Sequence, residues 1–178
     1  MDSHSESNSP SGGVRRPHPT SSSPPKRDHL HRLSNVWTRN PLYFITCCTA
    51  TRRPLLATPD TAAILTDAFR NSSRFHGWSV GRCVIMPDHV HFFARPQTDA
   101  KTLNDFIRNW KKWTTRELIH FAKASAPVWQ PEFFDHLLRS ADSYSEKWDY
   151  VRHNPVRAGL SSTPEEWSHS GECEVLTF

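Results

Sequence analysis

Two histidines, His89 and His91, flank Val90 in a segment rich in β-branched and aromatic residues. Side chains alternate between the two faces of a β-strand, so we expect both imidazoles on one face, roughly 6 to 7 Å apart along the strand. Imidazole binds divalent transition metals, and two imidazoles on a rigid strand can occupy adjacent coordination positions of one ion. Histidines with this spacing are more often exposed or hydrogen-bonded, so the pair alone leaves both interpretations open.

A phenol and an amide lie four residues apart further along the chain, at Tyr150 and Asn154. Residues four apart share one face of a helix, so the phenol and the amide are expected side by side. Each residue also has an ordinary interpretation, Tyr150 as a packing residue and Asn154 as a helix cap. Tyr144 is the weaker candidate for a nucleophile, because it lies about 240° around the helix from Tyr150 and has no asparagine four residues later.

The patterns of apolar residues predict an α+β fold that would position these side chains. We expect four strands and three helices in the order strand, helix, strand, strand, helix, strand, helix. This order predicts a ferredoxin-like antiparallel sheet with helices on one face, plus a C-terminal helix that carries the tyrosine. The predicted strands are 42–49, 78–86, 89–95 and 133–138, and the predicted helices are 60–75, 103–124 and 143–153.

The composition allows nucleic-acid binding and argues against a membrane or disulfide-rich protein. The chain has 178 residues, a net charge of +4, a pI near 9.0 and seven tryptophans, and a basic balance favours contact with phosphates. The four cysteines form no CxxC pair, and no apolar run reaches the roughly 18 residues that span a bilayer. We therefore expect a cytoplasmic, nucleoid-associated protein.

Several blocks of sequence, taken together, resemble the HUH single-strand endonucleases and within them the REP-associated tyrosine transposases. The combination of the Pro-Asp-His-Val-His block with Tyr-x-x-x-Asn-Pro-Val-Arg-Ala-Gly-Leu is highly specific, and the blocks follow the order of that family. The blocks are Tyr43-Phe44-Ile45-Thr46, Met86-Pro87-Asp88-His89-Val90-His91, Trp129-Gln130, Phe134-Asp135-His136-Leu137-Leu138-Arg139 and residues 150–160.

The resemblance implies a metal-dependent enzyme that cleaves and rejoins single-stranded DNA. Tyr150 would be the nucleophile that forms a 5′-phosphotyrosine, and His89, His91 and Asn154 would hold Mg²⁺ or Mn²⁺. Two imidazoles with an amide suit Mn²⁺ better than Mg²⁺, which prefers oxygen ligands. The expected substrate is a hairpin derived from repeated DNA, and a monomer is favoured over a dimer.

The resemblance also suggests how the chain is divided and which residues lie near DNA. We expect a disordered Ser/Pro/basic tail over residues 1–35, a catalytic domain over 36–165 and a C-terminal extension over 166–178. Asp135 and His136 are expected near the metal site, although a structural hydrogen bond is as good an explanation. The expected phosphate contacts are Arg52, Arg53, Arg108, Lys111, Lys112, Arg139, Arg152 and Arg157.

Two other functions remain open from the sequence. The same scaffold would serve a domesticated DNA-binding regulator that has no catalytic activity. A metalloenzyme that acts on small phosphoesters is a third possibility, and the basic surface argues against it.

Overall fold

The structure is a computed structural model that describes residues 41–177 of the chain. The chain divides at Asn35, and all described residues belong to the second unit, Val36–Phe178, which is compact. The predicted disordered tail over residues 1–35 lies outside the described residues.

The second unit is built on a five-stranded sheet with the order β4-β1-β3-β2-β5, in which every pair of neighbours is antiparallel. The first four strands have the order expected of the ferredoxin-like plan, so the predicted fold class is confirmed. A short edge strand beside β2 was not predicted. The strands are β1 (Leu42–Cys48), β2 (Trp78–Met86), β3 (His89–Pro96), β4 (Phe134–Leu138) and β5 (Ser170–Glu172).

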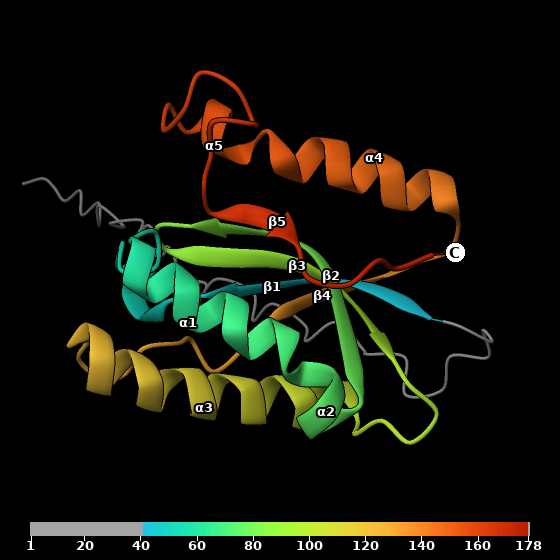
Figure 1. Ribbon diagram of the computed structural model, residues 1–178, viewed down its shortest axis with the longest axis horizontal. Helices are drawn as coiled ribbons and strands as arrows, with labels where there is room; N and C mark the ends of the chain where they lie inside the picture. The colour runs from blue at the N-terminus through green and yellow to red at the C-terminus, as the bar shows by residue number, and fades with distance from the viewer. Residues whose placement is uncertain (1–40, 178) are drawn as a thin grey trace, which may run out of the picture. The chain divides into compact units, whose positions relative to one another are not determined.

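The helices lie on both faces of this sheet, with α1 and α3 on one face and α4 on the other (Figure 1). Thr58 caps the N-terminus of α1, where a capping box with Thr61 closes the first turn. None of the helices in residues 41–177 is long and apolar enough to cross a membrane. The helices are α1 (Pro59–Arg70), α2 (Ser72–His76), α3 (Leu103–Ala122), α4 (Ala141–Arg152) and α5 (Asn154–Arg157), with a 3-10 turn η1 (Ala50–Arg52) after β1.

Apart from shifts of one or two residues at helix ends, the helices differ from the prediction in two places. The single helix expected over 60–75 is divided at Asn71, whose side chain donates to the carbonyl and carboxylate of Asp67 and so competes with the helical hydrogen bonds. The Asn154-Pro155 pair does not end the helical region, because Pro155 fits the first turn of the new short helix α5.

The two faces of the sheet bury different hydrophobic clusters. On the face covered by α1 and α3, Trp110 is fully buried and stacks on Phe69 with 5.2 Å between ring centroids. On the α4 face, Phe93 packs edge-to-face against Tyr144 at 4.8 Å. Because β3 alternates, His89 and His91 continue the Phe93 row and face α4, on a strand held by the core beneath it.

Candidate active site

The two histidines lie together at the start of β3, as the strand alternation predicted. His91 is paired in register with Thr46 of β1, and His89 with Cys48. The two imidazole rings are 4.6 Å apart between centroids and nearly perpendicular. Both rings therefore present their edges to one small volume on the α4 face of the sheet.

Each imidazole is held through the same ring atom, Nδ1. His91 Nδ1 lies 2.8 Å from the hydroxyl oxygen of Thr46, and His89 Nδ1 lies 2.6 Å from a carboxylate oxygen of Asp88. Histidines that bind metals commonly use one ring nitrogen for the ion and the other for a hydrogen bond of this kind. The arrangement leaves Nε2 of each ring as the atom that a metal ion would take.

The surroundings keep both imidazoles neutral. The pKa of His91 is lowered to about 3, mainly by burial and in part by the nearby His89 and the cationic Arg52, Lys147 and Arg157. Burial also lowers the pKa of His89, although the carboxylate of Asp88 opposes this shift. Neutral imidazole is the form that binds metals.

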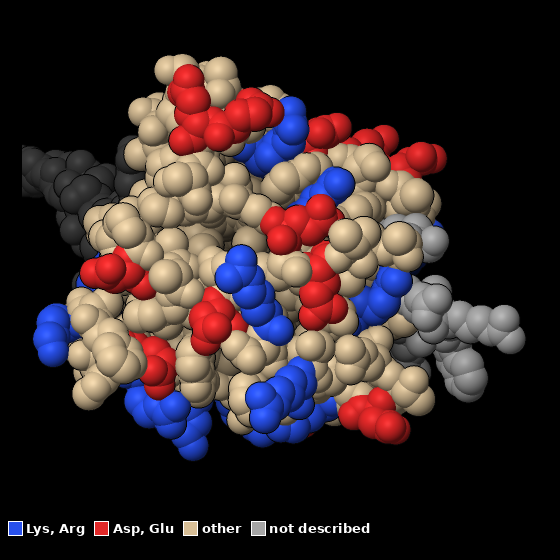
Figure 2. All heavy atoms as spheres, viewed as in Figure 1, with Lys and Arg blue, Asp and Glu red and all other residues tan. Residues whose placement is uncertain are grey.

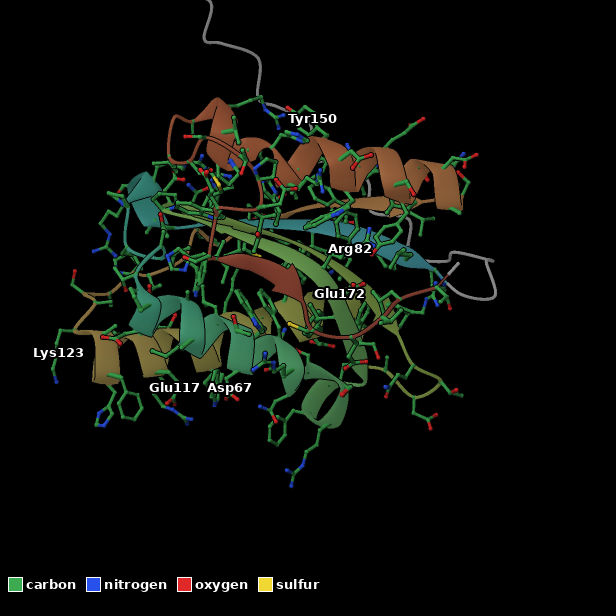
Figure 3. The ribbon with its side chains drawn as sticks, turned by 45° about the horizontal axis from the view of Figure 1, so that its top comes forward. Asp67, Arg82, Glu117, Lys123, Tyr150 and Glu172 are labelled. Carbon is green, nitrogen blue, oxygen red and sulfur yellow. The ribbon has the colours of Figure 1, made fainter. Side chains whose placement is uncertain are left out.

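Tyr150 approaches the histidines from α4 of the same chain. The ammonium of Lys147 lies 5.9 Å from the ring centroid of Tyr150 and 5.4 Å from that of Phe44, and Phe44 stacks on His91 at 5.4 Å. Tyr150 is 62% exposed, and Figure 3 shows it on α4, across the sheet from Glu117 and Lys123. One chain thus brings together an accessible phenol and the histidine pair.

Asn154 begins α5, and its side chain is already engaged. Arg157 donates to the amide oxygen of Asn154 and to the main-chain carbonyl of Tyr150. The guanidinium also lies over the ring of Tyr150, 4.2 Å from its centroid. Asn154 can therefore act as a third ligand only if Arg157 releases the amide oxygen.

The predicted metal ligands form an unusual donor set. Within residues 41–177, no three His, Cys, Asp or Glu side chains come together as a metal-binding group. The expected set has only two residues of those types, His89 and His91, and takes its third ligand from an amide. The two imidazoles, each hydrogen-bonded through Nδ1, fit a divalent transition metal. The amide oxygen of Asn154 accepts a hydrogen bond from Arg157 and is not free to bind the same ion.

Two of the expected DNA contacts have structural partners instead. Arg53 donates to the hydroxyl and carbonyl of Ser125 at 2.7 Å and to the carbonyl of Pro127. Lys111 donates to the carbonyls of residues 130–132 at 2.8 to 3.2 Å. Both cations stabilise loops, and contact of Arg53 and Lys111 with phosphates stays a prediction.

Three of the expected DNA contacts lie on the exposed surface, namely Arg108, Lys112 and Arg139. Arg108 is paired with Asp105 one turn earlier. Figure 2 shows basic side chains gathered along the edge of the molecule where Figure 1 places α2 and α3, with acidic groups between them. Contact of these three residues with DNA stays a prediction.

Arg52 and Arg152, two further expected DNA contacts, are both held by acidic partners. Arg152 lies 3.4 Å from a carboxylate oxygen of Glu165. Arg52 forms an ion pair with Asp88 at 2.7 Å, beside the histidines rather than out in solvent.

The two residues expected near the metal site are separated by the sheet. His136 is paired with Phe44, so it shares the α4 face with the histidines. Asp135 is paired with Ile45 of the buried core and points to the opposite face. Asp135 therefore does not surround the imidazoles, because a shift of one residue along a strand exchanges its faces.

Sequence reasoning missed the residues that hold the site together. Thr46 and Asp88 belong to the sequence blocks that carry the family resemblance, but the sequence assigns them no role. It assigns none to Lys147 either. The signal that could have found Thr46 is strand pairing, because the antiparallel pairing of β1 with β3 places its hydroxyl opposite His91. The contact of Lys147 with both Phe44 and Tyr150 depends on how α4 lies across the sheet, which the sequence does not specify.

Comparisons with known proteins agree with this geometry. A family model described as "Transposase IS200 like" matches residues 38–154. A REP-associated tyrosine transposase of Escherichia coli K12 is 27% identical over 129 residues, which cover 72% of this chain and 74% of that protein. The solved structure of a REP-associated tyrosine transposase bound to a REP hairpin matches with a TM-score of 0.64 and 25% identity, covering 79% of this chain and 82% of that one. The predicted resemblance is thus confirmed, and the chain belongs to the IS200-like transposase family, a family of DNA-transesterifying enzymes.

Proposed function

We propose that this protein is a metal-dependent endonuclease and strand transferase for single-stranded DNA, with Tyr150 as its nucleophile. The observation that carries the proposal is a series of contacts within one chain that links Tyr150 on α4 to His91 on β3. Lys147 contacts the rings of both Tyr150 and Phe44, and Phe44 stacks on His91. An exposed phenol next to two neutral imidazoles is the arrangement that a tyrosine-dependent transesterification needs.

His89 and His91 would hold Mn²⁺ or Mg²⁺ through Nε2, and Asn154 would complete the set through its amide oxygen. When bound, such an ion polarises a phosphodiester and offsets the negative charge that develops on it. The hydrogen bonds of His91 with Thr46 and of His89 with Asp88 fix the orientation of the two imidazoles. Two nitrogen ligands favour Mn²⁺ over Mg²⁺.

The covalent step exchanges one phosphoester bond for another. The phenolic oxygen of Tyr150 attacks the scissile phosphorus and its proton passes to solvent. The bond from phosphorus to the 3′ oxygen breaks, and that oxygen leaves as a 3′-hydroxyl after it takes up a proton. The 5′-phosphotyrosine keeps the energy of the original ester, so a second 3′-hydroxyl reverses the step and joins strands. Lys147 and Arg157 place positive charge around the ring, where it attracts the DNA backbone.

We further propose that the substrate is a hairpin formed by repeated DNA in the nucleoid. Support comes from the related transposase whose solved structure holds a REP hairpin. The basic balance of the chain is consistent with this substrate.

The proposal is tested by trapping the covalent intermediate. Labelled single-stranded hairpin DNA is incubated with Mn²⁺ and the wild type, Tyr150→Phe or Tyr144→Phe, and the products are separated under denaturing conditions. We expect an adduct with the wild type and with Tyr144→Phe but none with Tyr150→Phe. Tyr144→Phe is a matched control, because its hydroxyl is buried in the α4 face and has no hydrogen-bond partner. An equal adduct with Tyr150→Phe, or full cleavage without metal, contradicts the proposal.

A non-catalytic DNA-binding regulator is the alternative, and one observation favours it. Arg157 occupies the amide oxygen that the third metal ligand would supply. Tight hairpin binding without cleavage in Mn²⁺ or Mg²⁺, over hairpins of varied sequence, would support this function.

We also propose that one chain is sufficient for cleavage, because Tyr150 and His91 are linked through contacts within a single chain. Mixing Tyr150→Phe with His91→Ala tests this point, since each variant retains the group that the other lacks. We expect the mixture to be inactive. Recovery of adduct formation in the mixture indicates a dimer that exchanges its tyrosine helices.

A further inference from the structure

The turn that follows β1 contains two consecutive residues in the left-handed region of backbone space. Thr51 has a φ of 54° and Arg52 a φ of 58°. Neither residue is glycine, and this conformation is unfavourable for a side chain with a Cβ atom. Such conformations persist only where the surrounding structure holds them, and they gather at functional sites.

The turn directs the side chain of Arg52 toward the histidines. Arg52 Nε lies 2.7 Å from one carboxylate oxygen of Asp88, and a terminal nitrogen donates to the Cys48 sulfur at 2.7 Å. The other carboxylate oxygen of Asp88 lies 2.6 Å from Nδ1 of His89. The carboxylate of Asp88 therefore connects the guanidinium to the imidazole, and a terminal nitrogen of Arg52 also lies 3.5 Å from Nδ1 of His89.

The main chain also ties this turn to the β2–β3 hairpin. The amide and hydroxyl of Thr49 both donate to the carbonyl of Asp88, at 2.9 and 3.0 Å. The amide of Leu56 donates to the carbonyl of Pro87 at 2.8 Å. The strained turn is thus bonded at both of its ends to the two residues that precede His89, so Arg52 and His89 are held in fixed relation.

We propose that Arg52 is a positioning residue of the active site, which orients Asp88 and through it the imidazole of His89. With its carboxylate fixed, Asp88 accepts a hydrogen bond from Nδ1–H of His89. Nε2 of His89 is then directed into the site. This role rests on the proposed function of His89 as a metal ligand. It assigns to Arg52 a task other than contact with DNA, and it accounts for the strained backbone.

The geometry also explains why arginine is needed there. The guanidinium fork reaches Asp88 and Cys48 from different nitrogens at once. A lysine has one nitrogen on a flexible stem and fixes no such plane. Arg52→Lys keeps the positive charge but loses the planar guanidinium. The variant therefore distinguishes an orienting role of Arg52 from a purely electrostatic one.

The first experiment measures Mn²⁺ affinity by electron paramagnetic resonance of the free ion, in the full chain and without DNA. Loss of a residue that orients a metal-binding histidine lowers affinity by about 10- to 100-fold. We expect this loss in Arg52→Lys and in Asp88→Asn, and the loss in the double variant should be smaller than the product of the two because both residues act on one imidazole. Arg116→Gln is the control, since it removes one positive charge from an exposed ion pair on α3. Affinities of Arg52→Lys and Arg52→Gln equal to the wild type overturn the proposal.

A second measurement tests the role of Arg52 in the metal-free protein. Nitrogen-15 spectra of histidine side chains in the metal-free protein report which ring nitrogen carries the proton. We expect His89 of the wild type to carry it on Nδ1, and Arg52→Lys and Asp88→Asn to shift that population, while thermal unfolding confirms that each variant is folded. If the wild type binds no Mn²⁺, the metal-dependent function fails, and the spectra still decide whether Arg52 orients His89. Unchanged spectra in folded variants refute the role of Arg52.

Discussion

Thr46 is the partner of the second histidine, and its replacement tests how far the site depends on that hydrogen bond. Thr46→Val exchanges a hydroxyl for a methyl group of nearly the same size, and valine suits a β-strand equally well. The change removes the 2.8 Å contact between the hydroxyl oxygen and His91 Nδ1 while it leaves the register between β1 and β3 intact. His91 stays neutral, because its pKa of about 3 has burial as its main cause.

The magnitude follows from what the imidazole loses. A buried polar group without a partner costs about 1–3 kcal/mol, and loss of a hydrogen bond behind a metal-binding histidine lowers metal affinity by about 10- to 100-fold. A tenfold change corresponds to about 1.4 kcal/mol, so the two ranges coincide. The agreement is expected, because both describe the loss of one hydrogen bond that selects the tautomer of His91.

The assay is a Mn²⁺ titration followed by electron paramagnetic resonance, with Thr46→Ser as the matched control. Serine keeps the hydroxyl, so Thr46→Ser should bind Mn²⁺ within a few-fold of the wild type. Thr46→Val should bind about 10- to 100-fold more weakly with little change in melting temperature. The reasoning is wrong if Thr46→Val binds as tightly as the wild type, or if Thr46→Ser loses as much affinity as Thr46→Val.

Three further predictions concern stability. Trp110→Ala should lower the free energy of unfolding by about 3–5 kcal/mol, because the fully buried indole stacks on Phe69; a loss under 1 kcal/mol in urea titration contradicts this core. Gly77→Ala should lower it by about 1–2 kcal/mol, since Gly77 has a φ of 71° and an added Cβ meets the main chain of Ala100 at 2.8 Å; an unchanged melting temperature is the contrary result. Burial lowers the pKa of His76 below 6.5 in the folded state, so on acidification this histidine is protonated in the unfolded state before it is protonated in the folded state. The free energy of unfolding therefore falls as the pH drops below about 6.5. His76→Leu should show a smaller decline in unfolding free energy between pH 7 and 5 than the wild type does, and an equal decline refutes that assignment.

Much of the fold could be predicted because its strands carry strong local signals. The segment 78–86 was predicted as a strand and is β2 to the residue, since its β-branched and aromatic residues end at the turn Pro87-Asp88. β5 could not be predicted from Ser170-Gly171-Glu172, which has no apolar alternation. Main-chain pairing to the open edge of β2 forms that strand, with Cys83 opposite Gly171.

The position of a site residue could be predicted only where a single strand or a single helix determines it. Alternation places His89 and His91 together whatever the rest of the chain does. The position of Asp135 depends on the register between β4 and β1, which a sequence does not specify, and this register directs Asp135 to the face opposite the histidines. The engagement of Asn154 by Arg157 depends on the turn from α4 into α5, where Pro155 continues the helical path instead of ending it.

The difference between the two faces of the sheet explains why the chemistry is found on one of them. The α1/α3 face buries a continuous aromatic cluster around Trp110, so a polar side chain placed there would lose water without gaining partners. The α4 face is closed by apolar contacts only over part of its length, where Tyr144 packs on Phe93. Beyond that contact, β3 presents His91 beneath Lys147 and Tyr150. The rigid cluster on one face therefore fixes the strand, and the incomplete cover on the other leaves its histidines accessible to an ion and to DNA.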